Sequence, residues 1–69
     1  MENNNNDKGF AAIREQILAV RDTGKTNMFD THTVQRIAFD MGLYELVSYI
    51  EYNRNAYAEF ILTGNEPLA

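Results

Sequence analysis

The chain has 69 residues, no cysteine and a formal net charge of −4. A chain of this length forms one small domain, and without cysteine it has neither disulfides nor thiolate zinc ligands to reinforce a thin hydrophobic core. No apolar run approaches the roughly 20 residues of a membrane-spanning helix, and the N-terminus lacks the basic and apolar segments of a signal peptide. We therefore expect a soluble cytoplasmic protein that is stabilised by helix packing or by a second subunit.

The charge is distributed unevenly along the chain. Residues 1–36 contain five basic and five acidic side chains, whereas residues 37–69 contain Arg54 against five acidic side chains. The C-terminal half therefore carries the whole acidic excess. Because nucleic-acid affinity comes largely from neutralising phosphates, this half is expected to repel a free duplex.

The first periodic segment predicts a helix over about 9–23. Residues 1–8, before it, are polar and rich in asparagine, and they are expected to form a disordered tail. Gly24, after it, is suited to a helix C-cap, because glycine takes the left-handed conformation without a Cβ clash. The apolar side chains at helical spacing are Phe10, Ile13, Ile17 and Val20.

Two further helices are predicted, over about 31–41 and 44–62. Asp30 offers an N-cap oxygen to the first of them, and Phe29 and Val34 have the spacing of a hydrophobic staple. The buried stripes are expected at Val34, Ile37, Ala38, Met41, Leu43, Leu46, Val47, Ile50, Tyr57 and Ile61.

These segments predict an all-α fold, because no strand pattern or repeat competes with them. We expect a small three-helix domain over residues 9–64 with a long C-terminal helix. The disordered tail would precede this domain, and a short tail over residues 65–69 would follow it.

The segment Ala19–Asp30, AVRDTGKTNMFD, fits a loose form of the nucleotide-binding P-loop pattern. A P-loop follows a buried strand and opens a helix whose N-terminal amides face the phosphates. Here a helix comes first, so its partly negative C-terminal end lies near Lys25, and the next helix begins only near Thr31. The sequence therefore predicts no nucleotide and no other cofactor.

Catalytic and metal sites are not expected either. His32 is the only histidine, and its first-turn position is usually exposed, without the orienting partner and nucleophile that catalysis requires. One histidine and scattered carboxylates do not form a closed set of metal ligands. We predict a protein that is not an enzyme.

The stretch Val34–Ile50 begins like a DNA-binding helix-turn-helix, with Gly42 at its turn. In the second half the apolar residues Val47 and Ile50 fall one place early, which rotates the helix by about 100°. This helix also has no arginine or lysine before Arg54 to read bases. A generic helical corner is favoured, and a small nucleic-acid-binding regulator is the alternative. Its phosphate contacts would be Arg14, Arg21, Lys25 and Arg36.

Four tyrosines fall in the predicted last helix. Tyr49 and Tyr52 should share a face, and Phe60 lies about three whole turns after Tyr49. These residues either cover a thin core or form a binding surface, since tyrosine combines apolar area with a hydroxyl. The second helix is too short to cover all of the third, which favours a protein-interaction module that self-associates through this last helix as a homodimer or binds another protein. The candidate interaction residues are Tyr44, Glu45, Tyr49, Tyr52 and Phe60.

The chain from Ile13 to Gly64 resembles a family of short uncharacterised helical proteins of bacteriophages and integrated elements of Gram-positive bacteria. The resemblance lies in IREQILAVRDTGKTNMFD, VQRIAFDMGLYELVSYI and YAEFILTG, and its most distinctive segment is TGKTNMFD, residues 23–30. It implies a mobile-element origin and no known activity or binding residue. A binding role for the linker Lys25–Met28 stays open.

Overall fold

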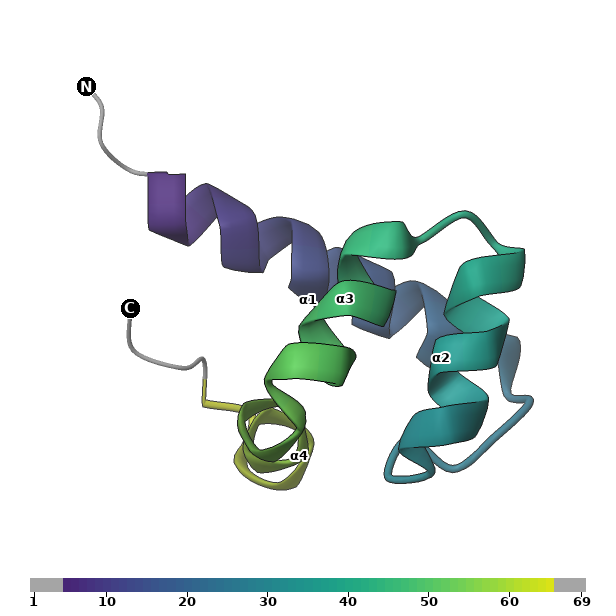
Figure 1. Ribbon diagram of the computed structural model, residues 1–69. Helices are drawn as coiled ribbons and strands as arrows, with labels where there is room; N and C mark the ends of the chain where they lie inside the picture. Colours follow the sequence, from purple (N-terminus) through teal and green to yellow (C-terminus); the bar gives the residue numbers. More distant parts are fainter. Residues whose placement is uncertain (1–4, 66–69) are drawn as a thin grey trace.

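The computed structural model describes the backbone of residues 5–65 and the side chains of residues 10–65. This part of the chain is entirely helical apart from its connections, which confirms the all-α prediction (Figure 1). The helices are α1 (Asn5–Thr23), α2 (Thr31–Asp40), α3 (Tyr44–Tyr52) and α4 (Arg54–Thr63). No helix in this part is long and apolar enough to cross a bilayer.

The core is assembled from all four helices. α3 contacts each of the other three, and α1 also contacts α2. Every buried residue belongs to a predicted apolar stripe, but Met41 does not join the core, because α2 ends at Asp40 and leaves Met41 43% exposed in the turn. The buried residues are Ile13, Ile17, Val20, Val34, Ala38, Leu46, Ile50 and Tyr57.

α1 begins four residues earlier than expected, at Asn5, so residues 5–8 of the predicted tail are helical. Extending an existing helix fixes only one residue per added hydrogen bond, so a polar turn can join it. Residues 1–4 of that tail, and 66–69 of the predicted C-terminal tail, lie outside the described residues.

Both predicted helix caps around the first connection are present. Gly24 has a φ of +66° and donates its amide to the Arg21 carbonyl at 3.0 Å, which ends α1. Asp30 accepts the Thr33 amide at 3.3 Å and the Thr33 hydroxyl at 2.8 Å. Phe29 is 51% exposed, so the start of α2 depends on this polar cap more than on the expected staple.

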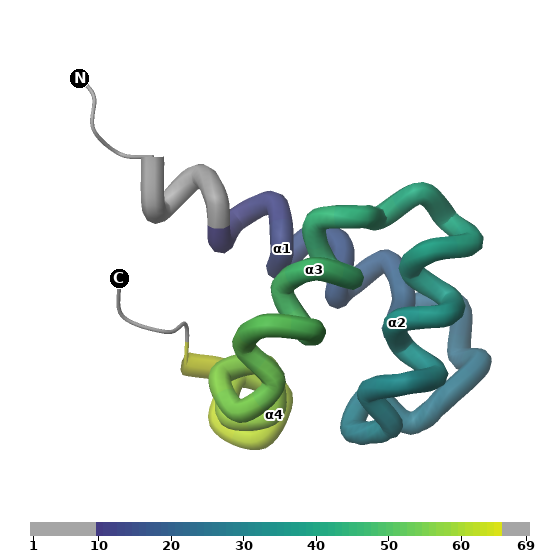
Figure 2. Tube along the Cα trace, viewed as in Figure 1, coloured from purple at the N-terminus to yellow at the C-terminus, as the bar shows by residue number. Residues whose placement is uncertain are grey.

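The predicted long helix over 44–62 is wrong, because the chain breaks it at Asn53 into α3 and α4. Asn53 takes φ −140° and ψ 47°, and α4 leaves in a new direction (Figures 1 and 2). The break returns Tyr57 to the core, where it is fully buried. A straight helix of 19 residues would extend about 28 Å and carry Tyr57 away from α1, so burial of apolar surface favours the bend.

Candidate interaction surface

An open depression of about 500 Å³ lies on the outer side of α3, next to α1. Its lining contains four of the five residues predicted for protein interaction. We call this surface the α3 face. It is formed by Ile13, Tyr44, Glu45, Ser48, Tyr49, Tyr52 and Asn53.

The two outermost tyrosines of the α3 face are strongly exposed. Tyr52 has 83% of its surface exposed and Tyr44 has 56%. The ring of Tyr44 lies 5.4 Å from that of Phe39, which is itself 59% exposed on α2. The apolar surface therefore continues from α3 onto α2. Phe39 is not among the predicted interaction residues, although its position outside the apolar stripe of α2 indicates an exposed ring.

Gln16 of α1 links the α3 face to the start of α3. Its side-chain carbonyl accepts the Leu46 amide at 2.9 Å, and its Nε2 donates to Glu45 Oε1 at 2.9 Å. Leu43, the N-cap residue, has no side-chain oxygen, so Gln16 supplies the missing cap from another helix. The hydrogen bond from Gln16 also lowers the pKa of Glu45, which keeps a negative charge in a fixed position on this surface.

Tyr49 and Phe60 pack on the same aromatic ring. Phe10 lies edge-on to Tyr49 at 5.7 Å and to Phe60 at 5.2 Å, with interplanar angles of 69° and 73°. Both rings are partly buried, and burial raises the pKa of the Tyr49 hydroxyl. Phe60 was expected to align with Tyr49, and both rings do contact Phe10, but Phe60 does not line the α3 face with Tyr52 because the break at Asn53 interrupts the helical phase.

A second, smaller pocket of about 210 Å³ lies where α1, the first connection and α4 meet. Phe60 belongs to this pocket and not to the α3 face. The lining is apolar except for Arg21 at its edge. It consists of Ile17, Leu18, Arg21, Met28, Phe60, Ile61 and Gly64.

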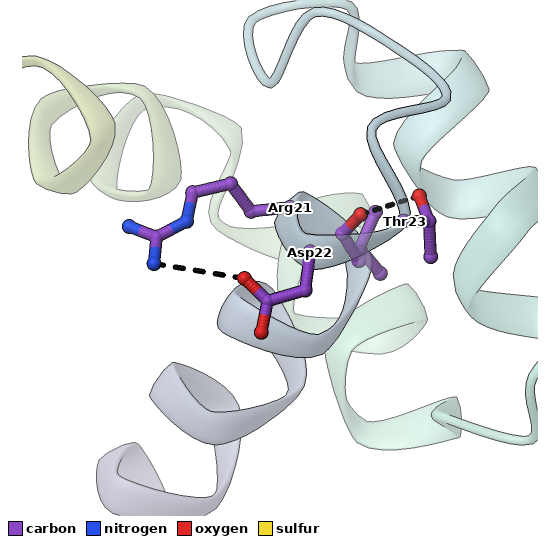
Figure 3. A network of polar contacts seen from close by, with 4 residues as sticks. Arg21, Asp22 and Thr23 are labelled. Atoms are coloured by element: carbon purple, nitrogen blue, oxygen red, sulfur yellow. Dashed lines mark hydrogen bonds and ion pairs between the residues drawn. The ribbon is translucent and has the colours of Figure 1, made fainter.

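The four basic residues proposed for nucleic-acid contact lie on three different elements. Arg14 and Arg21 belong to α1, Lys25 to the first connection and Arg36 to α2. Arg21 forms an exposed ion pair with Asp22, N to O 3.7 Å (Figure 3). This pair neutralises part of the positive charge at the end of α1.

The P-loop-like segment forms the end of α1 and a turn, with no strand before it in the described part of the chain. Lys25 is exposed, and its amide donates to the Thr23 hydroxyl at 3.2 Å. The Asn27 side chain accepts the Phe29 amide at 2.8 Å, and the Met28 carbonyl accepts the Tyr57 hydroxyl at 2.6 Å. Lys25, Asn27 and Met28 of this segment therefore take part in hydrogen bonds that hold the first connection in place.

His32 lies beside Arg54, whose guanidinium donates to the Thr31 hydroxyl at 3.2 Å and is 3.4 Å from the imidazole. Among the described residues, no three histidine or carboxylate side chains are grouped closely enough to hold a metal ion. The contacts of Arg54 with Thr31 and His32 therefore link the first residues of α4 to the first residues of α2.

Comparison with known proteins identifies a family for the chain. No curated protein and no solved structure matches the chain significantly. A family model described as "Domain of unknown function (DUF5049)" matches residues 11–65, which include the segments that carry the resemblance noted above. Because the match covers most of the sequence, the chain belongs to this family.

Proposed function

We propose that this protein is a non-enzymatic, cytoplasmic protein-interaction module and that the α3 face is its binding surface. The observation that supports this proposal is the grouping of Tyr44, Glu45, Tyr49 and Tyr52 around one open depression. Exposed tyrosines provide large, rigid contact area together with a hydroxyl, and they are enriched at protein interfaces.

The occupant of the α3 face is a second copy of the chain or another protein. In a symmetric dimer the same patch meets itself, so both copies bring an acidic Glu45 into the interface and the two like charges repel. Added salt would screen this repulsion and strengthen the dimer. A basic partner would instead be attracted to Glu45, and salt would weaken its binding.

The solution mass, measured from low to high micromolar concentration, tests the proposal. The wild-type chain should exceed the monomer mass, and Tyr44→Ala combined with Tyr52→Ala should return it to a monomer. Leu62→Ala is the matched control, since Leu62 is 71% exposed on α4 and outside the α3 face. If the double variant and the control associate equally, the α3 face is not the binding surface.

If the wild-type chain is a monomer in solution, the α3 face would bind a different protein. Affinity capture from a host lysate with the wild-type and double-variant chains would then identify it. The specific partner is the protein that the wild-type chain retains and the double variant loses. Equal capture by both chains would contradict the proposed surface.

The nucleic-acid alternative has one supporting feature, the corner between α2 and α3. Gly42, with φ +78°, turns the chain there, and the Leu43 amide donates to the Ala38 carbonyl at 2.8 Å. A tight corner of this kind is compatible with a helix-turn-helix, although Glu45 lies at the start of its second helix. The alternative predicts salt-sensitive duplex binding that weakens in Arg14→Ala or Arg21→Ala. Absence of binding at low salt would eliminate it.

A further inference from the structure

The corner between α3 and α4 consists of one residue, Asn53, and nothing in its local sequence requires a break. Neither proline nor glycine occurs there, although Asn53 and Arg54 interrupt the apolar spacing that begins at Leu43 and resumes at Tyr57. The Asn53 side chain does not cap α4. Its amide still donates to the Tyr49 carbonyl at 2.8 Å, and its carbonyl accepts the Tyr57 amide at 2.9 Å, as in an uninterrupted helix.

The break costs helical hydrogen bonds. The amides of residues 54–56 begin α4 and therefore have no acceptor within that helix. In a continuous helix they would bond to the carbonyls of residues 50–52. Local structure thus favours a straight helix, and only the tertiary contacts of α4 oppose it.

Those contacts are made with segments that precede α3 in the chain. The Tyr57 hydroxyl bonds to the Met28 carbonyl, Phe60 packs on Phe10, and Arg54 donates to Thr31. The docking position of α4, which contains Phe10, Met28 and Thr31, is called the α4 seat below. A second copy of the chain presents the same α4 seat, so its contacts can be made between two chains as well as within one.

We propose that α3 and α4 straighten into one helix over residues 44–63 and that α4 then occupies the α4 seat of a second copy, forming a domain-swapped dimer. Each chain keeps the contacts of the α4 seat and gains the helical hydrogen bonds that the break removes. Association costs translational and rotational entropy, so the exchange depends on protein concentration. The exchange does not depend on the tyrosines of the α3 face, although its hinge, Asn53, also lines that face.

Substitution of Asn53 changes the preference for the straight helix directly. Alanine is the strongest helix former, so Asn53→Ala should raise the dimer association constant about tenfold when both chains carry it. Asn53→Gly should lower the constant about threefold, because glycine is worse than asparagine in a helix. Asn55→Ala is the matched control. Residue 55 is exposed and helical in the monomer, and it would also be helical in the swapped dimer.

A distance measurement distinguishes exchange from surface association. Spin labels on Asp22→Cys and Leu62→Cys report the separation of α1 and α4, and the absence of native cysteine makes the labelling specific. Labelled chains are diluted with unlabelled chains so that only distances within one chain are detected. In the swapped dimer the labelled α4 sits on an unlabelled copy, so the short distance within the chain should be replaced by a long one.

The proposal is supported if the dimer of Asn53→Ala shows the long distance and the monomer shows the short one. A dimer that retains the short distance would overturn it, as would a monomeric Asn53→Ala chain at millimolar concentration. If Asn53→Ala does not fold, Asn53→Gln and the wild-type chain, refolded at high concentration, provide the same comparison. Loss of association on Tyr44→Ala with the short distance retained would instead support the α3 face.

Discussion

The hydroxyl of Tyr57 donates a hydrogen bond of 2.6 Å to the backbone carbonyl of Met28, across 29 residues of sequence. Tyr57 is fully buried, so its hydroxyl requires a partner inside the protein. The Met28 carbonyl, in the connection between α1 and α2, provides that partner. One side chain of α4 therefore fixes the linker whose role the sequence left open.

Removing this hydroxyl should destabilise the fold without removing the aromatic ring. Tyr57→Phe leaves the Met28 carbonyl unpaired and should lower the free energy of unfolding by about 1–2 kcal/mol. For a domain of this size, that corresponds to a fall in Tm of about 4–15 °C. Tyr52→Phe, on an 83% exposed residue, is the control and should leave the Tm nearly unchanged. Equal Tm values for the two variants would show that the bond adds nothing to stability.

The same tyrosine should make stability depend on alkaline pH. Burial raises the pKa of Tyr57 from 10.0 to about 12. Because the folded pKa is above the unfolded one, the protonated phenol stabilises the fold fully below pH 10 and loses this effect as the pH rises to 12. The expected loss is about 3 kcal/mol. Urea unfolding of wild type and Tyr57→Phe at several alkaline pH values measures it, and the wild-type advantage of about 1–2 kcal/mol at neutral pH should shrink above pH 10 and reverse as the pH approaches 12. Parallel curves would contradict the prediction.

Gln16 should contribute to stability through the start of α3. Gln16→Ala removes the acceptor of the Leu46 amide and the donor to Glu45, and should cost about 1 kcal/mol in the free energy of unfolding. Glu15→Ala, on the neighbouring exposed residue, is the control. Hydrogen exchange should show faster exchange of the Leu46 amide in Gln16→Ala alone. An unchanged exchange rate would mean that Gln16 does not cap α3.

Gly24 should be sensitive to substitution for a conformational reason only. A Cβ at this position meets no atom within 4 Å, but the φ of +66° is unfavourable for a residue with a side chain. Gly24→Ala should therefore lower the free energy of unfolding by about 1 kcal/mol, and Gly24→Asn by less. Lys25→Ala is the neighbouring control. Chemical denaturation gives all three values, and equal stability of Gly24→Ala and wild type would disprove the argument.

The candidate surface was partly predictable. Tyr44, Tyr49 and Tyr52 could be selected because four tyrosines exceed what one narrow buried stripe accommodates. Gln16 could not be selected, because its role depends on α1 crossing the start of α3, 30 residues away. Phe60 lies outside the α3 face, because its phase was counted through a helix that the fold interrupts.

The sequence by itself determined the helical class, the apolar stripes of the core and the boundaries that local chemistry controls. Gly24 ends α1 through its own left-handed backbone, and the Asp30 side chain caps α2 three residues away. The end of α1 and the start of α2 therefore follow from residue type. Only the tertiary structure decided the break at Asn53. The residue types of Asn53 and Arg54 do not by themselves require that break, which arises when burial of Tyr57 against α1 and the first connection outweighs the hydrogen bonds of a continuous helix.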